Sequence, residues 1–370
     1  MTDLVGELRS RRLVMELDPI RRPGAGRPTR PISLDGEPWT VLGAHVEADR
    51  VQFAASTVGG TELWRDTVVA EPAGVGSEAG LAVFDTALRR QLDRLPGDKS
   101  LVAVEVGLPG YIAQDRRTVG WSRELDWTDV PLSDLICATL AERGHHGVHV
   151  GITNDAQLAA LHATRVELAR PSDSVAVYLG GLRGIGSAVI IGGEIYRGAN
   201  GAAGDFGHLN VDPAGELHWC GRRGCLESVV GLPQLLAGSE LLTAQEAERL
   251  VREQPRKGIQ VLTEAAEAGD SGVLTALDLA GAALGRAIDD IVGIVNPQTV
   301  ILGGYLGCLG SYVLGPIKAG MAERTGLAAY ADTDVVALDR VLPRVVGGAV
   351  LAARDACLYD PLILTQPTSA

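Results

Sequence analysis

Four side chains that could bind a metal lie close together in the segment 208–225, namely His208, His218, Cys220 and Cys225. Zinc in closed structural sites prefers four nitrogen or sulfur ligands in tetrahedral geometry, and this segment offers four with none to spare. His218 and Cys220 are two residues apart, so on an extended segment they point to the same side. Gly221 and Gly224 permit a tight backbone path between the two cysteines. The pattern therefore favours one structural Zn²⁺ over four unrelated residues.

Length and composition limit the class of the protein. The chain has 370 residues, of which 46% are hydrophobic and 21% charged, so a soluble globular protein of two or three lobes is expected. We see no apolar signal segment at the N-terminus and no apolar run long enough to cross a bilayer. We therefore expect a cytoplasmic protein, in which the close-spaced cysteines indicate a metal site before a disulfide.

Charge is distributed unevenly along the chain. The formal net charge is −13, yet residues 1–31 carry seven arginines against four acidic residues, which leaves +3 on this arm and −16 on the rest. A basic arm on an acidic body suggests a polyanion as the partner of the arm. A solvated, irregular N-terminus explains the same composition, and from charge alone this second interpretation is preferred.

The elements that must position the metal segment follow from hydrophobic periodicity. Strands are expected at 40–46, 50–56, 63–69, 101–106, 147–152, 174–179, 186–197 and 299–302. Helices are expected at 78–93, 131–143, 155–168, 240–254, 258–268, 272–295, 310–325 and 345–357. Hairpin strands followed by strand–helix units thus occur twice, and this duplication predicts two α/β lobes with a cleft for a small ligand.

The metal segment also resembles the signature of the ROK family (repressors, open reading frames and kinases). The family pattern is Gly-Glu-x-Gly-His followed by Cys-x-Cys-Gly-x-x-Gly-Cys-x-Glu, and this chain departs from it at Asp205 and His218. Four further motifs are similar and occur in the same order: Gly107-Leu-Pro-Gly110, Thr153-Asn154-Asp155-Ala156, Gly180–Gly186, and Asn296-Pro297 with Ile301–Gly304. The resemblance implies an α/β fold of two actin-like or hexokinase-like (RNase H-like) lobes with an inter-lobe cleft, preceded by a partial winged-helix remnant.

The resemblance implies a sugar site as well. Sugar hydroxyls donate and accept hydrogen bonds, so amides, carboxylates and imidazoles suit them. The positions that correspond to the family's sugar ligands are Asn154, Asp155, Asp205, His208 and Glu227. His208 would then touch both zinc and sugar, and Asp205 is one methylene shorter than the family's Glu. Asn154 and Asp155 can also cap the helix that follows them, and the two roles are compatible.

Kinases of this family use Asp155 as the base that takes a proton from the sugar hydroxyl. They also have an Asp-x-Gly-Gly-Thr turn for ATP phosphates, but here His45 replaces the Asp and Glu47-Ala48-Asp49 replaces Gly-Gly-Thr. Carboxylates at this turn would repel phosphates, and Arg183 and Ala188 depart from the family's second phosphate loop. We therefore predict that the protein is not an enzyme and has no catalytic residue. The alternative is a weak ATP-dependent hexose kinase.

The N-terminal arm resembles the end of the winged helix–turn–helix that precedes the sugar-binding body in ROK regulators. Residues 2–17 would contain the end of a recognition helix, a turn at Ser10–Arg12 and a wing strand, and 18–31 a hairpin tip or linker. The residues expected to contact DNA are Arg9, Arg11, Arg12, Arg27 and Arg30. The front helices of such a domain are missing, so we expect a start codon assigned too late or a truncated gene, and weak DNA binding by the chain as it stands.

These interpretations give three predicted regions. Residues 1–31 are a partial winged helix with its linker, 32–170 the N-terminal lobe, and 171–370 the C-terminal lobe with the zinc knuckle 208–225. The predicted function is a transcriptional regulator that responds to a sugar or sugar phosphate. Its other partners would be operator DNA, if the full winged helix is present, and a second copy in a homodimer or homotetramer, with no membrane. The alternatives are a glucokinase-like kinase and a truncated sugar-binding protein that no longer binds DNA.

Overall fold

The computed structural model describes residues 2–10, 12–19, 30–74, 76–322, 332–338 and 344–365. Arg11 and Arg27, two of the residues predicted to contact DNA, lie outside these ranges. The chain divides into two compact units, Met1–Asn154 with Val346–Ala370, and Asp155–Val345. This division falls before the helix that starts at Asp155, whereas the boundary drawn from the sequence follows residue 170.

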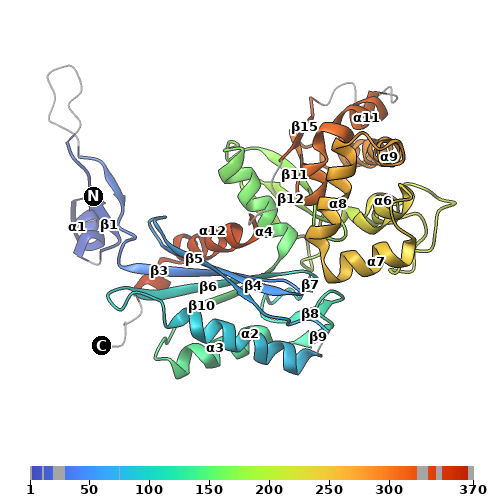
Figure 1. Ribbon diagram of the computed structural model, residues 1–370. Helices are drawn as coiled ribbons and strands as arrows, with labels where there is room; N and C mark the ends of the chain where they lie inside the picture. The colour runs from blue at the N-terminus through green and yellow to red at the C-terminus, as the bar shows by residue number, and fades with distance from the viewer. Residues whose placement is uncertain are drawn as a thin grey trace, which may run out of the picture. The chain divides into compact units, whose positions relative to one another are not determined.

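The first unit is built on a five-stranded sheet with the strand order β10-β6-β3-β4-β5 (Figure 1). Strands β3 (Trp39–Val46), β4 (Arg50–Thr57) and β5 (Glu62–Val69) are antiparallel neighbours. Strands β6 (Ser100–Leu108) and β10 (His149–Asn154) follow in parallel on the other side of β3. The sheet is mixed because two hairpins supply one half of it and strand–helix units the other.

Helices cover both faces of this sheet, which explains why every residue of β3 is buried. Helices α2 (Ser77–Leu92) and α3 (Leu132–Glu142) place Phe84, Leu88 and Ile136 in the core of one face. Helix α12 (Arg344–Tyr359) packs on the other face at Gly43, where an added Cβ would lie only 2.8 Å from the backbone nitrogen of Val350. The glycine is therefore needed for the close approach of this helix.

A small three-stranded sheet extends the first unit beyond β6. It consists of β7 (Tyr111–Ile112), β8 (Val119–Ser122) and β9 (Trp127–Val130), and the sequence analysis did not predict it. These strands are short, and their pattern is weak because alternate residues face a core that only the tertiary structure provides. Trp127 is fully buried in that core.

The second unit repeats the strand order of the first. Its sheet runs β13-β12-β11-β14-β15. Strands β11 (Val175–Gly180), β12 (Gly186–Ile191) and β13 (Glu194–Tyr196) are antiparallel, and β14 (Thr299–Leu302) and β15 (Asp334–Ala337) follow in parallel. The two sheets therefore have the same topology, as the duplicated sequence pattern predicts.

Most of the remaining residues of the second unit are helical. The helices are α4 (Asp155–His162), which continues into a π-helical turn (Ala163–Glu167), α5 (Glu227–Val230), α6 (Leu232–Gly238), α7 (Ala244–Glu253), α8 (Pro255–Glu267), α9 (Ser271–Val295), α10 (Gly304–Cys308) and α11 (Gly310–Ala322). Two 3₁₀ turns, Phe206–His208 in this unit and Pro361–Thr365 in the first, complete the described elements. Helix α7 begins at Ala244 rather than at 240 because Thr243 and Glu246 form a capping box.

Helix α9 corrects one statement of the sequence analysis. Within the described residues it is a helix long and apolar enough to cross a membrane by length and composition, although no such run was expected. More than half of its most apolar stretch is buried inside the unit, where Leu277, Leu284 and Ile288 belong to the core. These features are those of a core helix in a globular protein.

The N-terminal arm contains a helix followed by a strand, as predicted, and this strand pairs with residues 32–34, which were assigned to the N-terminal lobe. Helix α1 (Thr2–Ser10) leads into β1 (Val14–Glu16), which pairs with β2 (Ile32–Leu34) so that Met15 lies opposite Ser33. Leu13 is buried in the same cluster as Trp39 of β3 and Cys357 of α12. The arm is thus packed on the first unit through apolar contacts.

Candidate functional site

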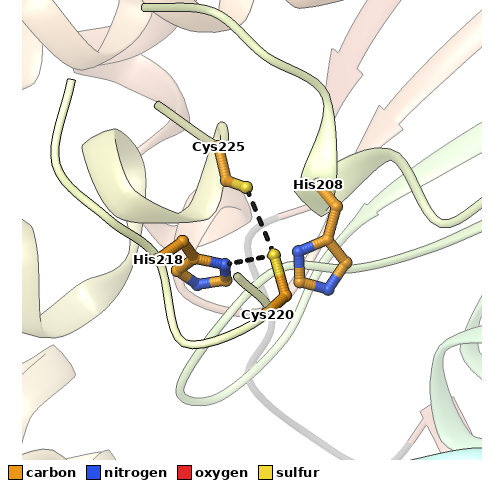
Figure 2. Close-up of side chains that lie close together, drawn as sticks. All are labelled: His208, His218, Cys220 and Cys225. Carbon is orange, nitrogen blue, oxygen red and sulfur yellow. Dashed lines mark hydrogen bonds between the residues drawn. The ribbon is translucent and has the colours of Figure 1, made fainter. Parts of the chain in front are cut away.

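The four predicted metal ligands converge in the second unit, as Figure 2 shows. One nitrogen or sulfur atom of each of His208, His218, Cys220 and Cys225 lies within 4.8 Å of the corresponding atoms of the others. The Nδ1 atom of His218 is 3.2 Å from the Cys220 sulfur, and the sulfurs of Cys220 and Cys225 are 3.6 Å apart. The cysteines are free thiols, so these distances reflect clustering and not a disulfide.

The backbone between residues 210 and 225 explains this convergence. The amide of His218 donates to the carbonyl of Arg222, and Leu217 pairs with Arg223, so the ligands sit around a tight reversal of the chain. Gly224 has φ +63°, and a Cβ there would lie 1.6 Å from the carbonyl oxygen of Asp212. The spacing of the two cysteines thus depends on a glycine at position 224, as the sequence suggested.

The geometry and chemistry of the cluster fit a tetrahedral metal ion. For metal–sulfur bonds of about 2.3 Å, a tetrahedral site separates its sulfurs by about 3.8 Å, close to the observed separation. The buried Nδ1 atom of His208 has no hydrogen-bond partner among the described residues, as expected of a nitrogen that faces a metal position. Burial and the Cys220 thiol raise the pKa of Cys225 to about 11, so metal binding would have to displace its proton. The cluster is therefore a candidate metal centre of a composition compatible with zinc.

Glu227, the first residue of α5, connects the cluster of four candidate metal ligands, called the metal cluster below, to a neighbouring loop. Its Oε1 atom lies 3.2 Å from Nε2 of His218 and accepts a 3.0 Å hydrogen bond from the indole nitrogen of Trp219. Its Oε2 atom accepts a 2.9 Å hydrogen bond from the backbone nitrogen of Ile185. The carboxylate predicted to bind sugar is thus already held by three groups of the protein.

The other predicted sugar ligands occupy two places. Asp205 precedes the 3₁₀ turn of His208, and its carboxylate lies 3.7 Å from the His208 Nε2 atom. Burial raises the pKa of Asp205 and the charge of Glu227 raises it further, while His208 opposes both. Asn154 ends β10 and donates a 3.0 Å hydrogen bond to the carbonyl of Gly110, and Asp155 begins α4. Asp205 and Glu227 therefore lie beside the metal cluster, to which His208 belongs. Asn154 and Asp155 are consecutive residues at the boundary between the two units in the sequence.

The matching motifs and their arrangement agree with a comparison of the sequence with protein families. The ROK family matches residues 84–343. The chain belongs to the ROK family. The predicted α/β fold of two actin-like or hexokinase-like lobes is therefore confirmed, and the relatives of this chain include both a glucokinase and a repressor.

Two relatives and one solved structure illustrate this range. The chain is 28% identical over 249 residues to a glucokinase of Halalkalibacterium halodurans, covering 65% of this chain and 73% of that one. It is 24% identical over 342 residues to the DNA-binding transcriptional repressor Mlc of Escherichia coli, covering 89% and 79%. A ROK family transcriptional regulator described as a homologue of the E. coli Mlc protein superposes with a TM-score of 0.78 at 20% identity, covering 98% and 89%. At that identity the structural match shows the shared fold.

In this ROK protein the first hairpin turn, between β3 and β4, is closed by its own side chains. Glu47 is buried and accepts a hydrogen bond from Gln52, and His45 Nδ1 lies 3.6 Å from the same carboxylate. Arg50 binds Asp49 at 2.5 and 3.1 Å, and the Glu47 amide donates to the Arg50 carbonyl. Both carboxylates that replace the family's glycine turn are therefore engaged within the hairpin instead of facing outward as bare charges.

The second loop of the predicted phosphate region, Gly180–Gly186, is the turn of the β11–β12 hairpin. Gly180 pairs with Gly186, and the amide of Tyr305 donates to the carbonyl of Gly181. The guanidinium of Arg183 donates to the backbone carbonyl of Arg252 near the end of α7. The loop is thus packed against two helices of its own unit, and Ala188 lies within β12 opposite Tyr178.

The described arginines of the arm are all near carboxylates. Arg9 and Arg30 lie 2.7 and 3.1 Å from Glu16, and Arg12 lies 3.8 Å from Asp35. Their side chains remain more than half exposed, so these ion pairs are weak and a phosphate could replace the carboxylate. Glu16 lies in the strand that follows helix α1, so the basic arm supplies one of its own acidic partners.

Trp219 is a residue of the site that sequence reasoning missed. It stands between two of the candidate metal ligands in the sequence, and its ring lies 5.1 Å from that of His208 and 5.0 Å from that of His218. Its side chain is 43% exposed while its indole nitrogen is bonded to Glu227. Its position between His218 and Cys220 was the available signal, because a residue flanked by two candidate ligands lies near the cluster that they form.

Proposed function

We propose that this ROK protein is a transcriptional regulator that senses a sugar or sugar derivative through a zinc-organised site and lacks significant ATP-dependent kinase activity. The observation that carries the proposal is the closed β3–β4 turn. Phosphoryl transfer needs backbone N–H groups and Mg²⁺ around the nucleotide phosphates. Here the Glu47 amide is bonded within the turn and a buried carboxylate fills the place of the glycines.

Two further observations support the regulator. The alignment with the E. coli repressor covers 89% of this chain and 79% of that repressor. The arm has a helix followed by an antiparallel strand pair, which is the order at the end of a winged helix–turn–helix. We infer that Arg9, Arg12 and Arg30 contact DNA phosphates, together with Arg11 and Arg27.

The proposed metal centre has Zn²⁺ bound by His208, His218, Cys220 and Cys225, in a structural role because all four positions are filled by protein. When bound, the ion would fix the knuckle that carries His208 and Glu227. The sugar would be bound by Asn154, Asp155, Asp205, His208 and Glu227, whose amide, carboxylate and imidazole groups suit hydroxyls. The protein would act in the cytoplasm as a homodimer or homotetramer.

Sugar binding can be tested by calorimetry of the zinc-loaded protein with glucose, xylose and N-acetylated amino sugars. Asp155→Asn should weaken binding of the preferred sugar by roughly 10- to 100-fold, the range for a lost charged hydrogen bond. Asp173→Asn, an exposed carboxylate of the same unit, is the matched control. If none of these sugars binds, the proposed sugar-sensing function is wrong.

The competing function is a glucokinase-like kinase, and the similarity of the chain to glucokinases supports it. A coupled assay with ATP, Mg²⁺ and each bound sugar separates the two. We expect turnover at least 100-fold below the roughly 1–100 s⁻¹ of ordinary kinases. Ordinary turnover that disappears in Asp155→Asn would establish the kinase instead. A gel shift of the whole gene product at stated salt, with and without the bound sugar, tests the regulator directly.

A further inference from the structure

The two histidines of the metal cluster are held differently. His218 has its Nδ1 atom at the cluster, 3.2 Å from the Cys220 sulfur, and its Nε2 atom 3.2 Å from the Glu227 carboxylate. His208 has the unpartnered Nδ1 atom, and its Nε2 atom is 3.7 Å from Asp205, beyond hydrogen-bond distance. A close carboxylate partner therefore belongs to His218, the ligand that replaces the family's cysteine.

We propose that Glu227 is a positioning residue of the metal centre, acting through the imidazole of His218, so that metal affinity and occupancy of the sugar site are linked through one carboxylate. The proposal rests on the zinc and sugar roles proposed above. A cysteine at position 218 could not form this link, since a thiolate bound to the metal has no second ring nitrogen to donate.

The chemistry of imidazole gives the reason. A neutral imidazole carries its proton on one nitrogen and a lone pair on the other, and only the lone pair binds a metal. The Glu227 carboxylate accepts only, so it selects the form of His218 with the proton on Nε2 and the lone pair on Nδ1, which faces the Cys220 sulfur. His218 is 8% exposed, which leaves little solvent to take over this hydrogen bond.

The surroundings of Glu227 make it a rigid support. Trp219 donates to the same Oε1 atom, and Ile185 donates its backbone N–H to Oε2. A carboxylate has about four acceptor positions, so three contacts leave about one for a sugar hydroxyl. A sugar that competes for Oε1 would therefore loosen His218, and one that uses the free position would stiffen it. Either way the coupling must be reciprocal, so zinc affinity changes with sugar as sugar affinity changes with zinc.

The test is a zinc competition titration of the full chain with a chromophoric chelator. Glu227→Gln should raise the zinc Kd by about 10- to 100-fold, as loss of such a carboxylate partner typically does. Glu216→Gln, an exposed carboxylate on the same knuckle, removes the same charge and should change Kd by less than about twofold.

Making the same change in a variant without His218 shows whether Glu227 acts through the imidazole. In His218→Cys, which restores a thiolate ligand without the second ring nitrogen, Glu227→Gln should leave the zinc Kd unchanged. An equal loss in both backgrounds, or no loss in the natural one, overturns the inference while the zinc centre stands. If the unmodified protein binds no zinc, the proposed zinc centre and this inference are both wrong. Should Glu227→Gln fail to fold, Glu227→Asp, which withdraws the carboxylate by one methylene, gives the same comparison.

Discussion

The two sheets have the same strand order but different loops at the tips of their first hairpins. In the first unit, the β3–β4 turn is closed by Glu47, Gln52 and the Asp49–Arg50 pair. In the second, the β11–β12 turn is rich in glycine, and its Ile185 amide is bonded to Glu227 beside the metal cluster. A repeated backbone topology therefore carries no chemistry of its own, and function depends on the side chains that a few loop positions hold.

The same contrast applies to what stabilises each unit. The first unit contains a large apolar core and an ion pair at 2.6 Å between the fully buried Glu105 and Arg116, whose side chain is 34% exposed. The second unit combines its core with a loop region, residues 204–226, that has little regular structure and that a metal ion would organise. We therefore expect the metal to matter for the second unit and not for the first.

The largest expected effect comes from removing a metal ligand. Cys225→Ser replaces a fully buried sulfur ligand, and zinc content should fall from about one atom per chain to near zero. Hydrogen exchange should then speed up in segments 204–231 of the second unit and remain unchanged in β3, β4 and β6. Elemental analysis and exchange mass spectrometry measure the two parts. Cys137→Ser, in helix α3 of the first unit, is the control, and equal loss of protection in both units would break the comparison.

The ion pair between the buried Glu105 and the partly exposed Arg116 in the first unit gives the next effect. Glu105 is 0% exposed, and its Oε2 atom has no hydrogen-bond partner among the described residues. Arg116→Met leaves this carboxylate without its counter-charge and should lower the free energy of unfolding by about 3–5 kcal/mol. Arg117→Met breaks an exposed pair with Asp134 and should cost less than about 1 kcal/mol. Urea unfolding measures both, and equal costs would show that the Glu105 carboxylate is stabilised by other groups.

The second unit has a comparable pair whose effect depends on pH. Burial alone would raise the pKa of Glu167, but the hydrogen bond and charge of Arg344, with His162, lower it below the usual 4.5. The unfolded chain therefore binds a proton first, so this stabilisation is complete above pH 4.5 and is lost as pH falls through the lowered value. Glu167→Gln should cost about 1.5–3 kcal/mol at pH 7 and flatten the loss of stability in acid.

Thermal or urea unfolding from pH 7 to pH 3 measures the Glu167 contribution. Glu248→Gln, an exposed carboxylate of helix α7, is the matched control and should leave the pH profile of the natural chain unchanged. A Glu167→Gln profile as steep in acid as that of the natural chain would contradict the assignment.

The smallest effect is expected at the arm. Glu16→Gln removes the shared partner of Arg9 and Arg30, and because the pairs are exposed, stability should change by less than about 1 kcal/mol. Affinity for duplex DNA should rise, and the salt dependence of binding should steepen by about 0.9 for each additional phosphate that the arm neutralises. Anisotropy titrations at several salt concentrations measure this, with Glu62→Gln on strand β5 as the control. If the salt dependence of DNA binding does not change, the arm does not contact DNA through these arginines.

Much of the fold followed from sequence patterns with strong periodicity. The strands at 40–46, 50–56, 63–69 and 299–302 and the helix at 272–295 lie within a residue or two of those in the structure. The segment 186–197 is instead the hairpin β12–β13, because Gly192 and Gly193 adopt positive φ and reverse the chain. Helices α5 and α6 were not predicted, since each is shorter than the window in which a 3.6-residue period can be recognised.

The sequence by itself determined which residues could bind a metal, since ligand type and glycine positions are local properties, and the order of the family's motifs. Only the tertiary structure decided how those residues are paired. It brought the Glu227 carboxylate to His218, Trp219 and Ile185, and it bonded the Glu47 carboxylate, which was expected to repel phosphates, to Gln52 within the hairpin. Such pairings depend on distances between segments that burial and backbone hydrogen bonds set jointly, and no single stretch of sequence encodes them.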